Sequence, residues 1–229
     1  MYKRVIREAF LSSIPVMMGY IVLGIAFGML LENKGYGVVY ALLMSVFIYA
    51  GSMQFVAINL LTSGASLISA AIMTLLINAR HMVYGLSMIK KFDDMGKFKL
   101  YMIFSLTDET YSLLVGSQVP EDCNQRYYLF LISFFDQCYW IIGSIIGAFV
   151  GSLMTINTTG LDFAMTALFV VIVLEQFLTS ERHIYTYIGF GVSVICLLIF
   201  GSESFIIPSV IGIILSLLFM YNKGGMKDA

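Results

Sequence analysis

The longest uncharged stretch of this sequence is GYGVVYALLMSVFIYAGSMQFVAINLLTSGASLISAAIMTLLINA, residues 35–79. A charged side chain at the centre of a membrane helix costs about 2.5–3.5 kcal/mol on insertion scales, so a run of this kind is typical of membrane-embedded helices. The whole chain has the same character, because 59% of its 229 residues are hydrophobic and 12% are charged. Soluble domains have about 45–50% apolar and about 25% charged residues. The composition excludes a water-soluble globular fold and predicts an all-α polytopic membrane protein.

Charged residues divide the chain into about seven to eight hydrophobic helical segments of roughly membrane-spanning length. These segments are Ala9–Leu31, Val38–Leu61, Leu67–Ile89, Leu100–Pro120, Tyr127–Leu161, Phe163–Ser180, His183–Ser202 and Ser204–Asn222. The longest strongly charged loop runs only from Lys90 to Lys99, which leaves no room for a soluble domain. We therefore expect one transmembrane domain that covers residues 1–229.

Basic residues indicate the topology, because loops rich in Lys and Arg stay on the cytoplasmic side. Two groups precede and follow the first three apolar segments: Lys3, Arg4 and Arg7, and Lys90, Lys91, Lys97 and Lys99. An even number of crossings must separate them, so one of the three segments between them does not cross completely. The loops after Asn33 and after Pro120 are nearly balanced in charge and are expected on the outer face. The N-terminus is expected in the cytoplasm.

The middle segment, Val38–Leu61, is the best candidate for an incomplete crossing. Gly51 and Ser52 weaken a helix at its centre, and Gln54 beside them is a hydrogen-bonding group at membrane depth. We expect a broken or re-entrant helix near Gly51, with residues 50–54 non-helical. The alternative is a continuous helix with a small-residue packing notch. Irregular backbone at this depth is tolerated only beside protein or a water-filled cavity, so a break indicates a transport pathway.

Arg80 is the most informative charged residue. It lies about ten residues, or about 15 Å of helix, before the Lys90 loop. Asn78, His81 and Gly85 share one helix face, and Arg80 stands to one side of it. We expect a buried Arg80 that binds a carboxylate or an anionic group of a substrate. The alternative is an arginine that reaches the cytosolic headgroups.

Three carboxylates interrupt the later apolar segments. Asp108 and Glu109 are adjacent and point about 100° apart on a helix, so one partner cannot easily satisfy both. We expect one of them to pair with Arg80 and the other to take up and release a proton. The alternative places both at a solvated interface. Asp136 lies deep in Tyr127–Leu161 and is a further candidate proton carrier.

Several function classes are excluded or made improbable by what the sequence lacks. It has no G-x-x-x-x-G-K-[ST], H-E-x-x-H or G-x-S-x-G motif, so we expect no ATPase, metalloprotease or serine hydrolase activity, and no enzyme. Two isolated histidines and three unpaired cysteines predict no metal site, disulfide framework or cofactor. The formal net charge of −1 and the isoelectric point near 6.1 give no basic surface for nucleic acid.

One glycine series predicts close helix packing. Gly143, Gly147 and Gly151 recur every four residues on the helix that contains Trp140. This spacing permits close approach of a neighbouring helix. Packing on a neighbouring helix explains the series, and the same face is a candidate for contact with a small membrane partner.

Five motifs follow one another over nearly the whole chain: Pro15-Val16-Met17-Met18-Gly19-Tyr20, Tyr49-Ala50-Gly51-Ser52-Met53-Gln54-Phe55, Asn78-Ala79-Arg80-His81 with Tyr84-Gly85, Asp108-Glu109-Thr110 and Gly160-Leu161-Asp162-Phe163-Ala164. In this order they resemble the AzlC family of two-component branched-chain amino acid exporters. The resemblance implies export of leucine, isoleucine, valine or related amino acids across the cytoplasmic membrane. It also implies a separately encoded small membrane subunit of the AzlD type.

An amino acid needs a donor for its carboxylate, an acceptor for its ammonium group and an apolar wall. The candidate substrate-binding residues are Gly51, Ser52, Gln54, Phe55, Asn78, Arg80, His81 and Tyr84, with Ile58 and Met88 as further apolar candidates. The candidate proton-coupling residues are Asp108, Glu109 and Asp136. The alternative function is a passive channel for small polar solutes, which would use the same polar cluster without proton coupling.

Overall fold

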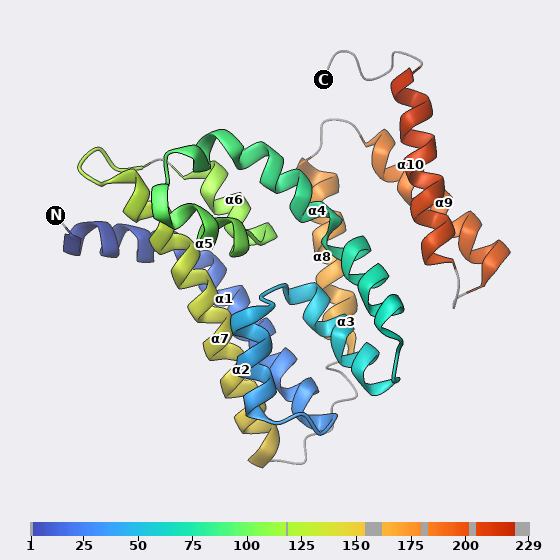
Figure 1. Ribbon diagram of the computed structural model, residues 1–229, viewed down its shortest axis with the longest axis horizontal. Helices are drawn as coiled ribbons and strands as arrows, with labels where there is room; N and C mark the ends of the chain where they lie inside the picture. Colours follow the sequence, from blue (N-terminus) through green and yellow to red (C-terminus); the bar gives the residue numbers. More distant parts are fainter. Residues whose placement is uncertain (1, 118, 154–161, 180–182, 202–204, 223–229) are drawn as a thin grey trace. The chain divides into compact units, whose positions relative to one another are not determined.

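The computed structural model describes residues 2–117, 119–153, 162–179, 183–201 and 205–222, and Figure 1 shows its helices. All secondary structure among these residues is helical, and the expected all-α polytopic membrane fold is confirmed. The chain forms two compact units, Met1–Leu168 and Phe169–Ala229. The first unit contains the predicted site and is described first.

Three long helices of the first unit are apolar enough to cross a membrane: α1 (Tyr2–Asn33), α4 (Leu67–Asp93) and α7 (Gln125–Leu153). With 32, 27 and 29 residues, each exceeds the roughly 20 residues that a hydrocarbon core requires. Ser66 caps the start of α4 through a hydrogen bond to its side chain from the Ser69 backbone N–H. These three helices run between two opposite ends of the first unit.

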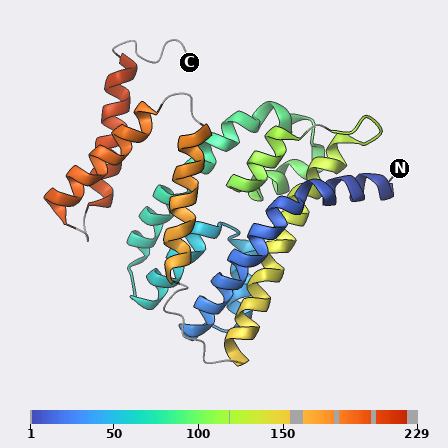
Figure 2. The ribbon, with the colours of Figure 1, turned by 180° about the vertical axis from the view of Figure 1, so that it is seen from behind.

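Helices α1 and α7 pack side by side along their lengths (Figure 2). Their backbones meet at glycines, since a Cβ atom on Gly24 would lie 3.0 Å from the Trp140 carbonyl oxygen and one on Gly143 would lie 2.8 Å from the Ile21 carbonyl oxygen. A Cβ atom on Gly147 would clash with the Ile25 backbone. The predicted close approach is therefore present, but the neighbour is α1 of the same chain. Packing thus accounts for the series, and α1 covers the glycine face that was a candidate for contact with a partner.

The middle segment is broken into α2 (Val38–Phe47) and α3 (Gly51–Thr62). Between them Tyr49 has a φ of 43°, in the left-handed region that a bulky residue rarely adopts. The break thus lies at residues 48–50, just before the position expected. Residues 51–54 were expected to be non-helical and instead form the first turn of α3. That turn is held by Gln54, whose side-chain oxygen accepts a hydrogen bond from the Ala50 N–H at 3.2 Å.

A second break, absent from our expectations, divides the segment Leu100–Pro120. It consists of α5 (Lys99–Phe104) and α6 (Asp108–Gly116), after a short 3₁₀ turn, η1 (Gly96–Phe98). The Thr107 side chain caps α6 by accepting a hydrogen bond from the Thr110 N–H, which ends the continuous helix here. Asp108 and Glu109 then occupy the first turn of α6, where negative charge is favourable.

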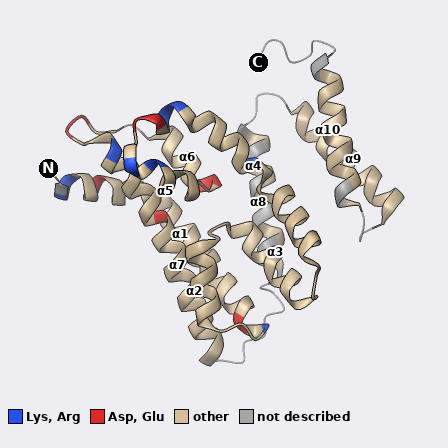
Figure 3. Ribbon diagram, viewed as in Figure 1, with Lys and Arg blue, Asp and Glu red and all other residues tan. Residues whose placement is uncertain are grey.

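The second broken segment returns to the end of the unit from which it starts. Lys91, near the end of α4, donates to the Leu114 carbonyl oxygen near the end of α6, and Arg4 pairs with Asp122 at 2.6 Å. Figure 3 shows the basic segments of α1, α4 and α7 gathered at this one end. The expectation that the loop after Pro120 lies on the opposite side from the N-terminus is therefore wrong, because α5 and α6 do not complete a crossing.

The first broken segment starts from the other end. Gly35, with a φ of 86°, turns the chain between α1 and α2, and Gly64, with a φ of 64°, turns it between α3 and α4. Only α1 and α4 then run the full length of the unit between the two basic groups. This arrangement matches the predicted even number of crossings.

The second unit contains most of α8 (Asp162–Thr179), together with α9 (Ile184–Phe200) and α10 (Ile206–Asn222). Helices α9 and α10 pack on each other, and a Cβ atom on Gly212 would lie 2.8 Å from Val192 Cγ1. Gly201, with a φ of 74°, ends α9. Of the family-like motif at residues 160–164, Gly160 and Leu161 lie outside the described residues.

Candidate functional site

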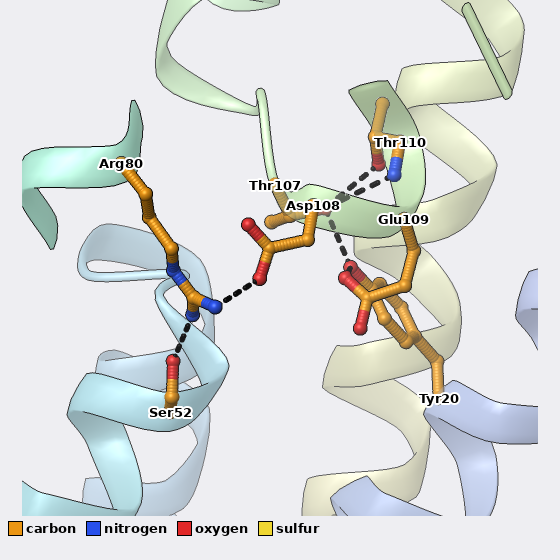
Figure 4. A network of polar contacts seen from close by, with 7 residues as sticks. All are labelled: Tyr20, Ser52, Arg80, Thr107, Asp108, Glu109 and Thr110. Carbon is orange, nitrogen blue, oxygen red and sulfur yellow. Dashed lines mark hydrogen bonds and ion pairs between the residues drawn. The ribbon is translucent and has the colours of Figure 1, made fainter. Parts of the chain in front are cut away.

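The two helix breaks meet at Arg80, near the middle of α4 (Figure 4). Its Nη1 atom lies 2.6 Å from Asp108 Oδ2, and its Nη2 atom donates to Ser52 Oγ. Ser52 is in the first turn of α3 and Asp108 is in the first turn of α6. The predicted contact between Arg80 and one of the adjacent carboxylates is present, and Asp108 is the partner.

The N-termini of α3 and α6 both lie beside the arginine. The unpaired N–H groups of a helix N-terminus carry partial positive charge and favour anions. Broken membrane helices commonly use such ends to bind the charged groups of their substrates. Here two helix ends and one guanidinium group lie beside Asp108.

Three buried polar atoms of α4 and α6 have no hydrogen-bond partner among the described residues: Arg80 Nε and Asp108 Oδ1 at this junction, and Asn78 Oδ1 two residues before Arg80. Buried polar groups are nearly always paired, and an unpaired one costs about 1–3 kcal/mol. The side chains of Arg80 and Asp108 keep 22% and 19% of their surface accessible. At the junction a donor and an acceptor are therefore left for water or for a ligand.

Glu109 points away from Asp108 and belongs to a second network (Figure 4). Its Oε2 atom accepts a hydrogen bond from the Tyr20 hydroxyl at 2.8 Å. The Tyr20 hydroxyl also lies 2.5 Å from Thr107 Oγ1. Thr110 Oγ1 lies 3.0 Å from Thr107 Oγ1 and 2.8 Å from Asp136 Oδ2. The three predicted carboxylates are thus brought to one region, with Glu109 and Asp136 joined by hydroxyl groups.

Gln54 and Phe55 point into the core of the first unit. Gln54 Oε1 accepts from Trp140 Nε1 at 3.0 Å as well as from the Ala50 N–H. Phe55 packs edge-on against Phe27, with ring centroids 5.7 Å apart, and is 3% exposed. Gln54 therefore supports the break between α2 and α3, and Phe55 packs in the core cluster around Trp140.

Gly51 faces an aromatic ring of α7. A Cβ atom at this position would lie 3.3 Å from the Trp140 ring. Of the further apolar candidates, Ile58 joins the cluster around Trp140, and Met88 joins the cluster at the basic end of the unit. Their buried positions give them packing contacts with the three long helices.

His81 and Tyr84 lie beside α6. Tyr84 stacks on Tyr111 with ring centroids 4.6 Å apart and nearly parallel planes. His81 meets the Tyr84 ring edge-on at 6.1 Å. Since Tyr84 follows Arg80 by four residues and Tyr111 follows Asp108 by three, this aromatic pair lies next to the ion pair on both helices.

Sequence reasoning missed Tyr20, Thr107, Thr110 and Trp140. One signal for Thr107 was available: a threonine followed directly by Asp108 and Glu109 is typical of a helix N-cap. The contacts of Tyr20 and Trp140 join residues far apart in the sequence and have no local signature. Among the described residues, no group of three or more His, Cys, Asp or Glu side chains is placed to hold a metal ion.

Comparison with known proteins identifies the family. Residues 15–154 match the family model described as AzlC protein. The chain belongs to the AzlC family. This matched range contains Arg80, Asp108, Glu109 and Asp136, and it includes both helix breaks of this AzlC-family chain.

Relatives align with most of this AzlC-family chain. It is 41% identical over 208 residues to the branched-chain amino acid transport protein AzlC of Bacillus subtilis, which covers 91% of this chain and 82% of the relative. It is 40% identical over 218 residues to an uncharacterized membrane protein of Helicobacter pylori, with 95% of each chain covered. It is 31% identical over 175 residues to the inner membrane protein YgaZ of Escherichia coli, with 72% and 71% covered. No solved structure matches the chain.

Proposed function

We propose that this chain is a secondary transporter that exports branched-chain or related amino acids across the cytoplasmic membrane, driven by protons. The observation that carries the proposal is the contact of Arg80 with Ser52 and Asp108, at which two broken helices meet in the middle of the unit. The relative named as a branched-chain amino acid transport protein supports the substrate class. The N-terminus is cytoplasmic in this proposal, and residues 1–229 work as one transporter domain.

The chemistry of the junction suits a zwitterion. Arg80 and the N-termini of α3 and α6 offer positive charge to the substrate carboxylate. Asp108 Oδ1 and Asn78 Oδ1 offer acceptors to the substrate ammonium group, and both atoms are buried without a partner among the described residues. Binding would satisfy polar groups that are otherwise left unpaired, which favours a specific ligand over an apolar one.

The apolar side chain of the substrate requires a wall beside these charges. The stacked rings of Tyr84 and Tyr111 lie next to the ion pair on α4 and α6. Phe55 and Ile58, which were candidates for this role, are 3% exposed each. We therefore assign the wall to the tyrosine pair, and Gln54 and Phe55 shape the break that presents Ser52.

A small membrane subunit of the AzlD type completes the proposed transporter. This part of the proposal rests on the family, since α1 covers the glycine face that was a candidate for contact with a partner. We expect the chain to need that subunit for full activity. Saturable transport by the purified single chain at the rate of the pair would show that this part of the proposal is wrong.

Proteoliposomes that contain the chain with its small subunit test the transport function. Radiolabelled leucine should leave vesicles faster when a pH gradient is imposed, and unlabelled leucine on the opposite side should accelerate the flux of the label. A passive channel would show neither saturation nor acceleration by exchange. Glu109→Gln should abolish the response to the pH gradient and leave exchange partly intact, because exchange needs no net proton movement. If Glu109→Gln and Asp108→Asn both leave the pH response unchanged, the proton carrier lies elsewhere.

A further inference from the structure

Five oxygen atoms form a continuous chain between two carboxyl groups of the first unit. The chain runs from Glu109 through the hydroxyl groups of Tyr20, Thr107 and Thr110 to Asp136. Its four contacts measure 2.8, 2.5, 3.0 and 2.8 Å. These are ordinary hydrogen-bond distances between oxygens, and each such contact requires one hydrogen atom between the pair. Asp136 is fully buried, and Tyr20 is 4% exposed.

The number of hydrogen atoms in this chain decides its protonation. Each hydroxyl group supplies one hydrogen, so three hydroxyl groups supply three hydrogens for four contacts. With Glu109 and Asp136 both ionised, one contact would bring two lone pairs together at hydrogen-bond distance. A fourth hydrogen, carried by one of the two carboxyl groups, satisfies every contact. The Thr110 backbone N–H supplies none of the four, because it points to Thr107 as the cap of α6.

From this count we propose that Glu109, Tyr20, Thr107, Thr110 and Asp136 form a relay that holds one proton between two carboxyl groups. In one state Asp136 carries the proton and every hydroxyl group donates toward Glu109. In the other state Glu109 carries it and every hydroxyl group donates toward Asp136. Conversion breaks four O–H bonds and forms four, so no proton enters or leaves the chain and its net charge stays at one negative.

The position of the relay gives it a role in transport, and that role rests on the proposed function. Glu109 is next to Asp108 at the Arg80 junction, and Asp136 lies inside the unit on α7. The positive charge of a substrate ammonium group at the adjacent Asp108 favours the ionised form of Glu109 and moves the proton to Asp136. Loss of the substrate reverses the shift. Substrate binding then determines which carboxyl group holds the proton, and the proton reaches Asp136 through the hydroxyl groups and not through water.

Other titratable groups surround the relay on every helix packed against it. These are Arg80 on α4, Asp108 on α6, Tyr49 before α3, Tyr101 on α5, and Cys138 and Tyr139 on α7. Arg80 and Asp108 pair with each other, Tyr101 bonds to Gln137 at 2.6 Å, and Tyr139 bonds to Ser13 at 2.9 Å. The relay therefore carries the unbalanced negative charge of this region.

Infrared spectroscopy of the purified protein near neutral pH tests the shared proton without substrate or gradient. The wild type should show the carbonyl band of one protonated carboxyl group from this pair, with the shift in heavy water that such a group gives. Glu109→Gln and Asp136→Asn should each abolish the band. Each amide donates the fourth hydrogen itself, so the remaining carboxyl group is ionised. Tyr139→Phe, which removes a neighbouring hydroxyl outside the chain, should keep the band.

Removal of the middle hydroxyl separates the two carboxyl groups. When Thr110 is replaced by Val, the additional substitution Glu109→Gln should no longer change the carbonyl band of Asp136. When Thr110 is replaced by Ser, which keeps the hydroxyl group, Glu109→Gln should still abolish that band. Circular dichroism of each variant confirms that it is folded. A band that survives in either amide variant, or is missing in the wild type, would overturn the relay. Either result leaves the transport assay unaffected, and a failure of transport with the band intact would count against the proposed function alone.

Discussion

At the scale of the residue, Arg80 and Asp108 follow from the cost of charge in the membrane. An arginine in an apolar helix needs a carboxylate at the same depth, and only a few were available in the sequence. The pairing was therefore predictable, and the choice of Asp108 over Glu109 was not. That choice depends on the cap at Thr107, which sets the direction in which each side chain leaves α6.

Replacement of Arg80 by Lys tests the geometry of the junction at constant charge. A lysine ammonium group cannot reproduce the planar fork that contacts Ser52 and Asp108 together. Loss of one charge-assisted hydrogen bond is worth about 1.5–3 kcal/mol, or about ten- to hundredfold in transport rate. Arg126→Lys, an exposed position at the start of α7, is the matched control. Leucine flux in proteoliposomes measures both, and equal rates would contradict the assigned role.

The roles of the Tyr20, Thr107 and Thr110 hydroxyl groups could not be predicted from the sequence, and the reason is physical. Tyrosine and threonine occur throughout membrane helices at little cost, so a functional hydroxyl looks like any other. Charged residues stand out because lipid penalises them. The charged residues of the candidate site could thus be predicted from the sequence. The hydroxyl groups that connect them could be found only in the structure.

At the scale of the element, the break before α3 depends on Gln54. Its oxygen accepts from the Ala50 N–H and from Trp140 Nε1, and the side chain is fully buried. Gln54→Leu leaves both donors without a partner, and each such loss costs about 1–3 kcal/mol. We expect a lower melting temperature in detergent. Gln54→Glu, which keeps an acceptor oxygen, and Gln125→Leu at the exposed start of α7 should melt closer to the wild type.

The close packing of α1 against α7 at their glycines can be tested by substitution. A Cβ atom on Gly28 would clash with the Ser144 carbonyl oxygen and the Ala148 nitrogen, both of which belong to the backbone. Gly28→Ala should therefore separate the two helices and cost about 1–3 kcal/mol or more. Gly19→Ala on the same helix meets nothing within 4 Å and is the control. The fraction of monodisperse protein after purification, which should fall only for Gly28→Ala, measures the effect.

The two helix breaks differed in how readily they could be predicted. Gly51 and Ser52 marked the first break, although it lies slightly earlier, at residues 48–50, because Gln54 closes the first turn of α3. The second break has no glycine and contains only Ser105, Leu106 and Thr107. Its signal was the cap residue Thr107, whose effect on backbone direction outweighs the apolar character of the segment around it.

At the scale of the whole molecule, the first unit has two ends, and the loop at residues 119–124 shares one of them with the N-terminus. A cysteine-free variant that carries Glu121→Cys should react with a membrane-impermeant thiol reagent from the same side as a tag on the N-terminus. Lys34→Cys, at the other end of α1, should react from the opposite side. Reaction of both positions from one side would contradict the path of the chain described for α5 and α6.

The contact between Gln54 and Trp140 has a consequence for biosynthesis. The two residues are 86 positions apart, and a ribosome that adds about 5–20 residues per second needs roughly 4–17 seconds to reach the second after the first. During that interval the side-chain oxygen of Gln54 lacks the hydrogen-bond donor that Trp140 later supplies. We expect nascent chains that stop before α7 to be recognised as defective and degraded, so the quality control of this protein is decided late in its translation.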